Sequence, residues 1–303
     1  MHRALELLRT ACFAKALPSA LAVPQIHRQN GLNFAGARAR CGFARGHLLD
    51  IVVYVPGGSG GGREIDAAEA LVRLLVGEEL FERWVGTVSA TPTVRGGPLV
   101  VLNPSVEEHA ALPIDTLPET VRAAVAGLKL GLPPLPPLSA LDADWVAFEL
   151  EPERAVDYPA QDDLVVCSSR TPELKKSFLH GEPFFSGRFT NSDALFTYLK
   201  YETRSTSAQE QLAERAAIEA VVQRSLAPGD GVVVGLGLGT RYSYLDLALI
   251  NPNYARRRLV PALQAAGLPR RSWLLFCDSE LEREFLPIYP DSGEPYWGVR
   301  PDV

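Results

Sequence analysis

The sequence is poor in the residues and motifs that mark most catalytic and cofactor sites. It has four cysteines among 303 residues, at positions 12, 41, 167 and 277, and no CxxC pair, so neither a zinc knuckle nor a disulfide framework is indicated. Its five histidines have no metal-binding spacing, and both the GxSxG nucleophile motif and the Walker phosphate loop are missing. The sequence therefore predicts no metal site, no cofactor and no catalytic group. The cysteines are expected to be free thiols, as is usual in a reducing compartment such as the cytoplasm.

Long apolar runs are also missing, and the charge is uneven. Without an uninterrupted apolar run of roughly 18 residues, the chain is not expected to span a membrane. Residues 1–49 carry seven basic side chains and one acid, whereas the remainder carries 23 basic and 35 acidic side chains. An acidic body repels phosphate backbones and anionic lipid surfaces, so nucleic acid and membranes are not expected as partners.

The basic N-terminal segment differs in composition from the rest of the chain. We predict a flexible extension over residues 1–45, because the segment shows no strong apolar periodicity. An arginine-rich segment with few acids is also typical of organellar transit peptides, which is the alternative for localisation.

The first half of the chain predicts a small α+β domain over residues 46–131. An apolar β-branched run at 48–55 predicts a buried strand, and helical spacing of apolar residues predicts a helix over 64–84. Short strands are expected at 84–90 and 98–102, and a helix begins near Pro118. The prolines of 132–138 require an extended backbone, and we expect the proline-rich segment 132–142 to link two domains.

The second half, residues 143–303, predicts a ferredoxin-like α+β domain. Strands are expected at 144–152, 163–169, 231–239, 241–250 and 272–278. Helices are expected at 192–203, at 210–226 after a capping box that begins at Ser207, at 253–267 and at 279–286. From residue 163 the main elements follow the order βαββαβ, which predicts an antiparallel sheet with both helices on one face. In the strand 241–250, Leu245, Leu247 and Leu249 share one face, and Tyr242, Tyr244 and Asp246 share the other.

Two glycine-rich segments resemble nucleotide-binding loops without matching them. GGSGGGR at 57–63 lies between a strand and a helix, but Arg63 stands where the dinucleotide motif has its third glycine. A flexible loop is the favoured interpretation, and anion binding at the helix start stays open. GLGLG at 235–239 precedes a strand rather than a helix, so its glycines more often indicate a bulge or a close backbone approach.

Candidate binding residues come from two segments. The segment 170–191 is long, polar and aromatic, which favours either a packed loop or a binding surface. Tyr242 and Tyr244 resemble the aromatic pair that stacks RNA bases, but the acidic body favours packing of both tyrosines against the first domain. The candidate binding residues are Arg170, His180, Glu182, Arg188, Arg241, Tyr242, Tyr244 and Asp246.

These observations leave two functional hypotheses. The favoured one is a non-enzymatic binding or regulatory protein that engages a protein partner, because no catalytic arrangement is indicated and the predicted fold serves many functions. The alternative is a small-molecule enzyme with a site in the cleft between the domains, using His180, Glu182 and Arg188. A pocket that gathers several titratable side chains of 170–191 with Asp246 would favour the enzyme.

Overall fold

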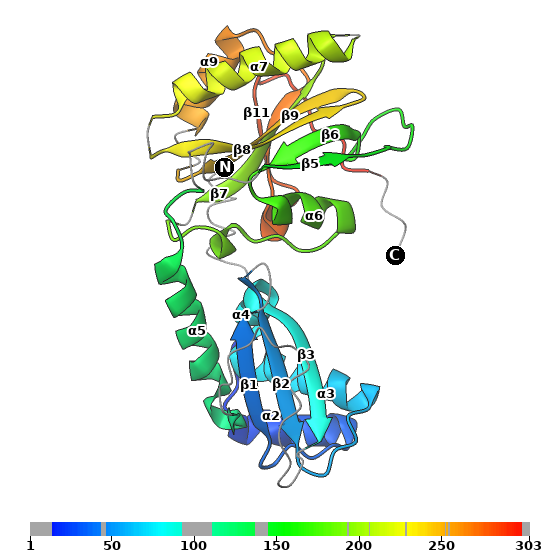
Figure 1. The fold of residues 1–303 in the computed structure, drawn as a ribbon, viewed down its shortest axis with the longest axis vertical. Helices are drawn as coiled ribbons and strands as arrows, with labels where there is room; N and C mark the ends of the chain where they lie inside the picture. Colours follow the sequence, from blue (N-terminus) through cyan, green and yellow to red (C-terminus); the bar gives the residue numbers. More distant parts are fainter. Residues whose placement is uncertain are drawn as a thin grey trace. The chain divides into compact units, whose positions relative to one another are not determined.

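The computed structural model describes residues 14–43, 47–92, 111–136, 145–192, 194–205, 207–227, 229–251, 253 and 255–298. The chain is a mixed α and β protein with two sheets (Figure 1). It divides into two compact units, one ending at Gly131 and the other beginning at Leu132.

The first unit contains a four-stranded sheet in the order β3-β2-β1-β4. Its strands are β1 (Arg38–Phe43), β2 (Leu49–Val55), β3 (Val85–Pro92) and β4 (Leu112–Pro113), and its helices are α2 (Ser19–Asn30), α3 (Gly62–Val76), α4 (Glu78–Trp84) and α5 (Leu117–Gly131). The helix predicted over 64–84 is interrupted at Gly77, whose φ of 87° favours glycine. The strand expected at 98–102 lies outside the described residues.

The core of the first unit begins before residue 45, so the flexible extension predicted over 1–45 is wrong for the part that the structure describes. Ala22 and Ile26 of α2 and the following Phe34 are fully buried in one cluster with α3, α5 and the sheet. β1 pairs with β2 over its whole length. The apolar residues of α2 form an unbroken run over 20–24, followed only by Ile26 before four polar residues, which is why its periodicity is weak although its buried side is well packed.

The second unit contains a seven-stranded sheet in the order β11-β10-β7-β9-β8-β6-β5, antiparallel throughout. Its strands are β5 (Val146–Glu149), β6 (Leu164–Ser169), β7 (Leu195–Glu202), β8 (Gly231–Gly239), β9 (Tyr242–Leu249), β10 (Ser272–Phe276) and β11 (Phe285–Pro287). Its helices are α6 (Pro172–His180), α7 (Ala208–Ser225) and α9 (Val260–Ala265), with a π-helical turn at Ala255–Leu259 and 3-10 turns at Ser186–Arg188 and Ser279–Leu281.

Three predicted elements of the second unit differ from the structure. The helix predicted over 192–203 is the inner strand β7, buried on both faces. The helix predicted over 279–286 is a 3-10 turn followed by β11. The expected loop 170–191 contains α6, which starts with Pro172 in its first turn and ends at Gly181 in the left-handed conformation. As a consequence, β6 is not the first strand of a four-stranded sheet but lies between β8 and β5.

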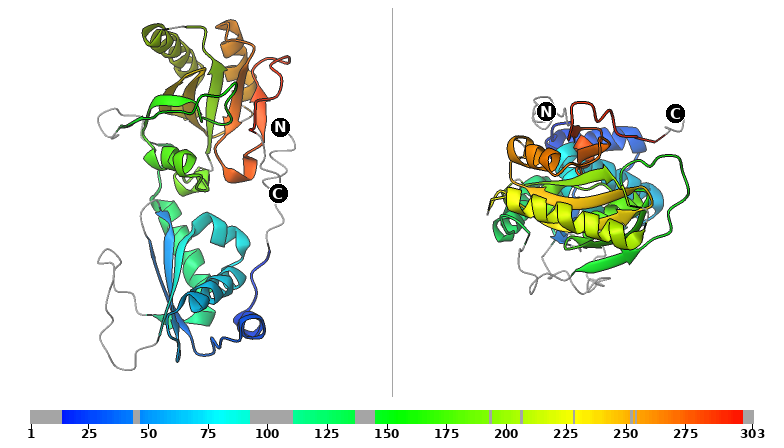
Figure 2. Two further views of the ribbon diagram at one scale, coloured as in Figure 1. Left: turned by 90° about the vertical axis from the view of Figure 1, so that its right-hand side faces the viewer. Right: turned by 90° about the horizontal axis from the view of Figure 1, so that it is seen from above.

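The two faces of this sheet have different covers (Figure 2). On one face, the leucines of β9 pack with Ile218 and Val222 of α7 and Leu263 of α9. On the other face, Tyr242 and Tyr244 pack with Leu174 of α6 and with Phe184. The tyrosine face is therefore covered by segments of its own unit, and the predicted cover by the first domain is wrong. The alternation predicted for β9 is confirmed by these two clusters.

Candidate functional site

A closed triangle of polar side chains lies between α6 and the tyrosine face of the sheet. The Nζ atom of Lys175 is 2.7 Å from Oδ2 of Asp246 and donates to Oε1 of Gln161 at 2.5 Å. The Nε2 atom of Gln161 donates to Oδ1 of Asp246 at 2.9 Å. Because a lysine ammonium can only donate, its contact with Oε1 fixes the orientation of the Gln161 amide.

This ion pair is removed from water. Lys175 is 1% exposed, Asp246 0% and Gln161 4%. Desolvation of two charges costs several kcal/mol per ion, and the mutual attraction repays it only with good geometry and further hydrogen bonds. Gln161 supplies such hydrogen bonds to both partners.

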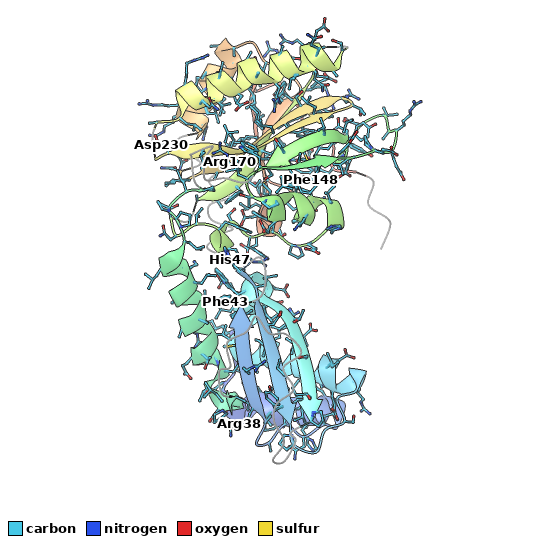
Figure 3. The ribbon with its side chains drawn as sticks, in the orientation of Figure 1. Arg38, Phe43, His47, Phe148, Arg170 and Asp230 are labelled. Carbon is cyan, nitrogen blue, oxygen red and sulfur yellow. The ribbon has the colours of Figure 1, made fainter. Side chains whose placement is uncertain are left out.

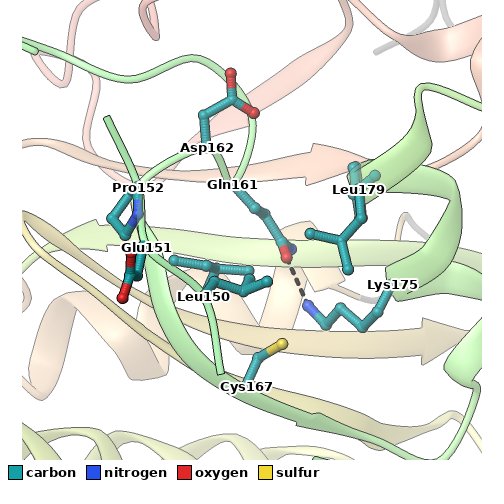
Figure 4. A pocket seen from close by; sticks show the side chains of 10 residues that line it. Leu150, Glu151, Pro152, Gln161, Asp162, Cys167, Lys175 and Leu179 are labelled. Atoms are coloured by element: carbon teal, nitrogen blue, oxygen red, sulfur yellow. Dashed lines mark hydrogen bonds between the residues drawn. The ribbon is translucent and has the colours of Figure 1, made fainter. Parts of the chain in front are cut away.

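The triangle adjoins a cavity of about 220 Å³. Figure 4 shows the side chains that line this cavity, with the hydrogen bond between Lys175 and Gln161. Lys175, Gln161 and the thiol of Cys167 form its polar part, and Glu151 and Asp162 are further polar lining residues. The apolar lining residues are Leu150, Pro152, Leu164, Phe178 and Leu179. Burial raises the pKa of the Cys167 thiol, and the nearby Lys175 charge offsets this only in part. The thiol is therefore protonated at neutral pH and a weak nucleophile.

The glycines of β8 make room for buried carboxylates. A Cβ atom at Gly235 would collide with the carboxylate of Asp246, and one at Gly239 would collide with that of Asp163. Both are glycines of the GLGLG segment, so the close approach predicted there is confirmed, and what approaches is a side chain rather than a ligand.

Asp163 and Lys200 extend the buried polar region beside the triangle. The Asp163 carboxylate accepts the backbone N–H groups of Arg241 and Tyr242 at 2.8 Å and the hydroxyl of Tyr244. Lys200 donates to the carbonyl of Tyr158, and its Nζ lies 4.3 Å from the ring centre of Tyr242. Burial lowers the pKa of Lys200 to about 8, although nearby aspartates favour its charged form.

The candidate residues of α6 and the following loop do not come together in the pocket. His180 and Glu182 are exposed at the end of α6. Arg188 is buried, and desolvation lowers its pKa to about 10 while the charge of Asp278 opposes that shift. Arg170, which is labelled in Figure 3, stacks on Trp145, with its guanidinium carbon 4.7 Å from the ring centre.

The candidate residues Tyr242, Tyr244 and Asp246 of β9 are fully buried in the polar region, and only the preceding Arg241 is partly exposed. Asp246 belongs to the triangle. The hydroxyl of Tyr242 donates to Asp157 at 2.6 Å, and Tyr242 and Tyr244 are both 0% exposed. Arg241 is 2.7 Å from Glu202 in a half-exposed ion pair. A partner could not stack on either tyrosine without opening the fold.

The other glycine-rich loop is occupied by a side chain of the protein itself. The Glu64 carboxylate accepts the backbone N–H groups of Ser59 at 2.8 Å and of Gly60 at 2.6 Å. These hydrogen bonds lower the pKa of Glu64. These two loop N–H groups, just before the start of α3, are therefore bound to a carboxylate of the protein itself rather than offered to an external anion.

Sequence reasoning missed the central role of Lys175 and Gln161. Gln161 is 85 residues from Asp246, so nothing local indicated the triangle. Lys200 could have been found, because a lysine within the apolar run LFTYLKYE is unusual for a central strand. The unusual position of Lys200 could be recognised only if the segment LFTYLKYE was assigned as a strand, and it was predicted to be a helix.

Comparisons with models of known protein families, with curated proteins and with solved structures gave no match. Within the described ranges, no three His, Cys, Asp or Glu side chains are placed to hold a metal ion. None of the helices in the described part is long and apolar enough to cross a membrane.

Proposed function

We propose that this protein is a binding protein whose second unit holds a small organic molecule in the pocket beside α6. The observation that carries the proposal is the buried triangle of Lys175, Asp246 and Gln161, which adjoins a cavity with apolar walls. Ligand sites are typically concave, mostly apolar and provided with a few convergent polar groups. A buried ion pair contributes little net stability, so a role in ligand recognition accounts for it better than stability does.

Binding is better supported than catalysis. Of the titratable side chains in 170–191, Lys175 joins Asp246 at the pocket, whereas His180 and Glu182 are exposed elsewhere. The raised pKa of Cys167 argues against attack by a thiolate. The enzyme hypothesis differs in one measurable respect, because it requires that the bound molecule be converted to a product.

The test is a fragment screen of the full chain by ligand-observed NMR. Leu179 lines the pocket and is 42% exposed, so Leu179→Trp should fill the entrance without burying new surface in the core. The control is Leu212→Trp on α7, which is 48% exposed and outside the pocket lining. Fragments should lose binding in the first variant and keep it in the second. The proposal would be overturned if every fragment bound the Leu179→Trp variant as well as it binds the wild-type protein.

A protein partner remains a second proposal, and the outer strand of the sheet favours it. β5 ends the strand order of the seven-stranded sheet, and Val165 and Val166 of the adjoining β6 are 38% and 42% exposed. A partner could add a strand at such an edge. Capture of a partner should then be lost in Val166→Lys and kept in Leu212→Lys, and equal capture by both variants would contradict an interaction at this edge.

Two further points belong to this proposal. Part of the second unit follows the chain order βαββαβ, with the elements β7, α7, β8, β9, α9 and β10. In the sheet these strands lie in the order β10-β7-β9-β8. We therefore regard this part as a ferredoxin-like scaffold with further strands added at both edges. We also retain the cytoplasm as the location, since Cys41, Cys167 and Cys277 are free thiols.

A further inference from the structure

The polar part of the pocket offers hydrogen-bond donors. Lys175 has three N–H groups, of which one is used by Gln161 and one faces Asp246. The Gln161 amide gives one of its two N–H groups to Asp246. Within the described part of the chain, the third donor of Lys175 and the second donor of Gln161 have no protein acceptor. A ligand that satisfies them must bring acceptor oxygens.

The charge of the lining excludes a simple anion as the best ligand. Asp246 neutralises Lys175, and the remaining charged lining residues are Glu151 and Asp162. Both are exposed acids at the edge of the pocket, apart from Lys175 (Figure 4). Although much of the Asp162 residue is exposed, its carboxyl is partly desolvated, which raises its pKa, and a ligand cation nearby would favour its charged form. The two acids therefore favour a ligand that carries a cationic group in addition to its acceptor oxygens.

The size and walls of the cavity limit the rest of the ligand. Pockets for drug-sized molecules have roughly 300–1,000 Å³, and this cavity has about 220 Å³. Leu164, Phe178 and Leu179 line it with apolar surface. The body of the ligand should therefore be small and apolar.

We infer that the pocket binds a free amino acid with an apolar side chain. Its carboxylate is received by Lys175 and Gln161, its ammonium group lies toward Glu151 and Asp162, and its side chain packs between the apolar walls. This inference rests on the proposed function and names its ligand class.

The test is titration calorimetry of the full chain with valine, leucine, methionine and phenylalanine, each compared with two analogues. For leucine, isocaproate lacks the ammonium group and isopentylamine lacks the carboxylate. At least one amino acid should bind about tenfold or more tightly than both of its analogues, because each analogue leaves one set of charges or donors unpaired. Absence of such a preference in all four series would overturn the inference.

A double variant, Glu151→Gln with Asp162→Asn, should change the affinities for two ligands in opposite directions. Damage to the fold would weaken the binding of both. Both residues are exposed, so the fold should tolerate the changes. The variant should bind the amino acid more weakly and the deaminated analogue more tightly than the wild-type protein does. Equal weakening of both ligands would contradict the inferred orientation.

The outcomes also separate this inference from the function that it rests on. If fragments bind in a manner sensitive to Leu179→Trp but amino acids show no preference, the pocket binds ligands of another class and this inference is wrong. If no molecule responds to Leu179→Trp, both proposals are wrong.

Discussion

At the scale of single residues, the glycines of β8 and the carboxylates above them form one arrangement. Gly235 is in contact with Asp246, whose carboxylate is held by Lys175 and Gln161 and cannot swing into solvent. Glycine normally weakens a strand, because it loses more conformational entropy on folding than other residues. At this position it is required, since any side chain would occupy the space of the carboxylate.

Gly235→Ala should therefore destabilise the second unit by ~1–3 kcal/mol, the usual cost of forcing extra atoms into a packed core. The matched control is Gly127→Ala in α5, where a Cβ atom would meet nothing within 4 Å. That change should be neutral or stabilise the first unit by up to ~1 kcal/mol through helix propensity. Urea denaturation of both variants measures the two effects. A neutral Gly235→Ala would mean that the carboxylate of Asp246 is free to move.

The buried Lys200 should make the free energy of unfolding depend on pH. Its folded pKa is about 8, below the unfolded value of roughly 10.4. Between these values the unfolded chain binds more protons than the folded chain, so stability rises with pH. The lysine is charged in both states below pH ~8, where its burial costs stability, and this cost is relieved as the pH rises through that value.

The free energy of unfolding should thus increase between pH ~8 and ~10 by at most about 1.4 kcal/mol per pH unit from this group. Lys200→Met should remove that contribution, so the difference in slope between wild type and variant isolates it. Measurements above pH ~10 are avoided, because burial raises the pKa of Tyr242 to about 12 and ionisation of such tyrosines has the opposite effect. Equal slopes for the two proteins would show that Lys200 titrates normally.

At the scale of elements, α2 is a structural part of the first unit, although its sequence resembles a flexible extension. Ile26 is 0% exposed in the core, whereas Leu21 on the same helix is 58% exposed. The two residues have side chains of similar size, so they form a matched pair for testing whether the helix is docked.

Ile26→Ala should cost ~2–5 kcal/mol because it leaves a cavity in the core. Leu21→Ala should change stability by less than about 0.5 kcal/mol, as is usual for surface positions. Thermal and chemical unfolding of the two variants decides the matter. Similar small effects of both changes would restore the flexible extension that the sequence alone suggests.

The elements also explain which parts of the fold could be predicted. The hairpin of β8 and β9 and the start of α7 were predictable, because a two-residue turn and the capping hydrogen bond from Glu210 N–H to Ser207 are local signals. β7 was not, because both of its faces are buried and the alternation of polar and apolar residues is lost. The polar triangle depends on that sheet and on Gln161 in a distant loop, so Asp246 was found as a candidate without its partners.

At the scale of the whole molecule, each unit has a core of its own. One cluster lies within residues 22–125, and two large clusters lie within residues 164–288 on the two faces of the seven-stranded sheet, beside a small one of Phe276 and Leu281. The pocket and the triangle are built entirely from residues after Leu132. A unit with its own core and its own hydrogen-bonded sheet meets the usual criteria for independent folding.

A fragment of residues 132–303 should therefore fold when it is produced alone. Circular dichroism should give a cooperative thermal transition, and dispersed amide resonances should report fixed packing of the sheet. The fragment should bind the same molecules as the full chain and lose them in Leu179→Trp, because every lining residue is retained. A fragment that binds dye for exposed hydrophobic surface and melts without cooperativity would show that the second unit depends on the first. A folded fragment without binding would instead mean that the complete ligand site requires residues outside 132–303, contrary to the pocket proposed for this unit.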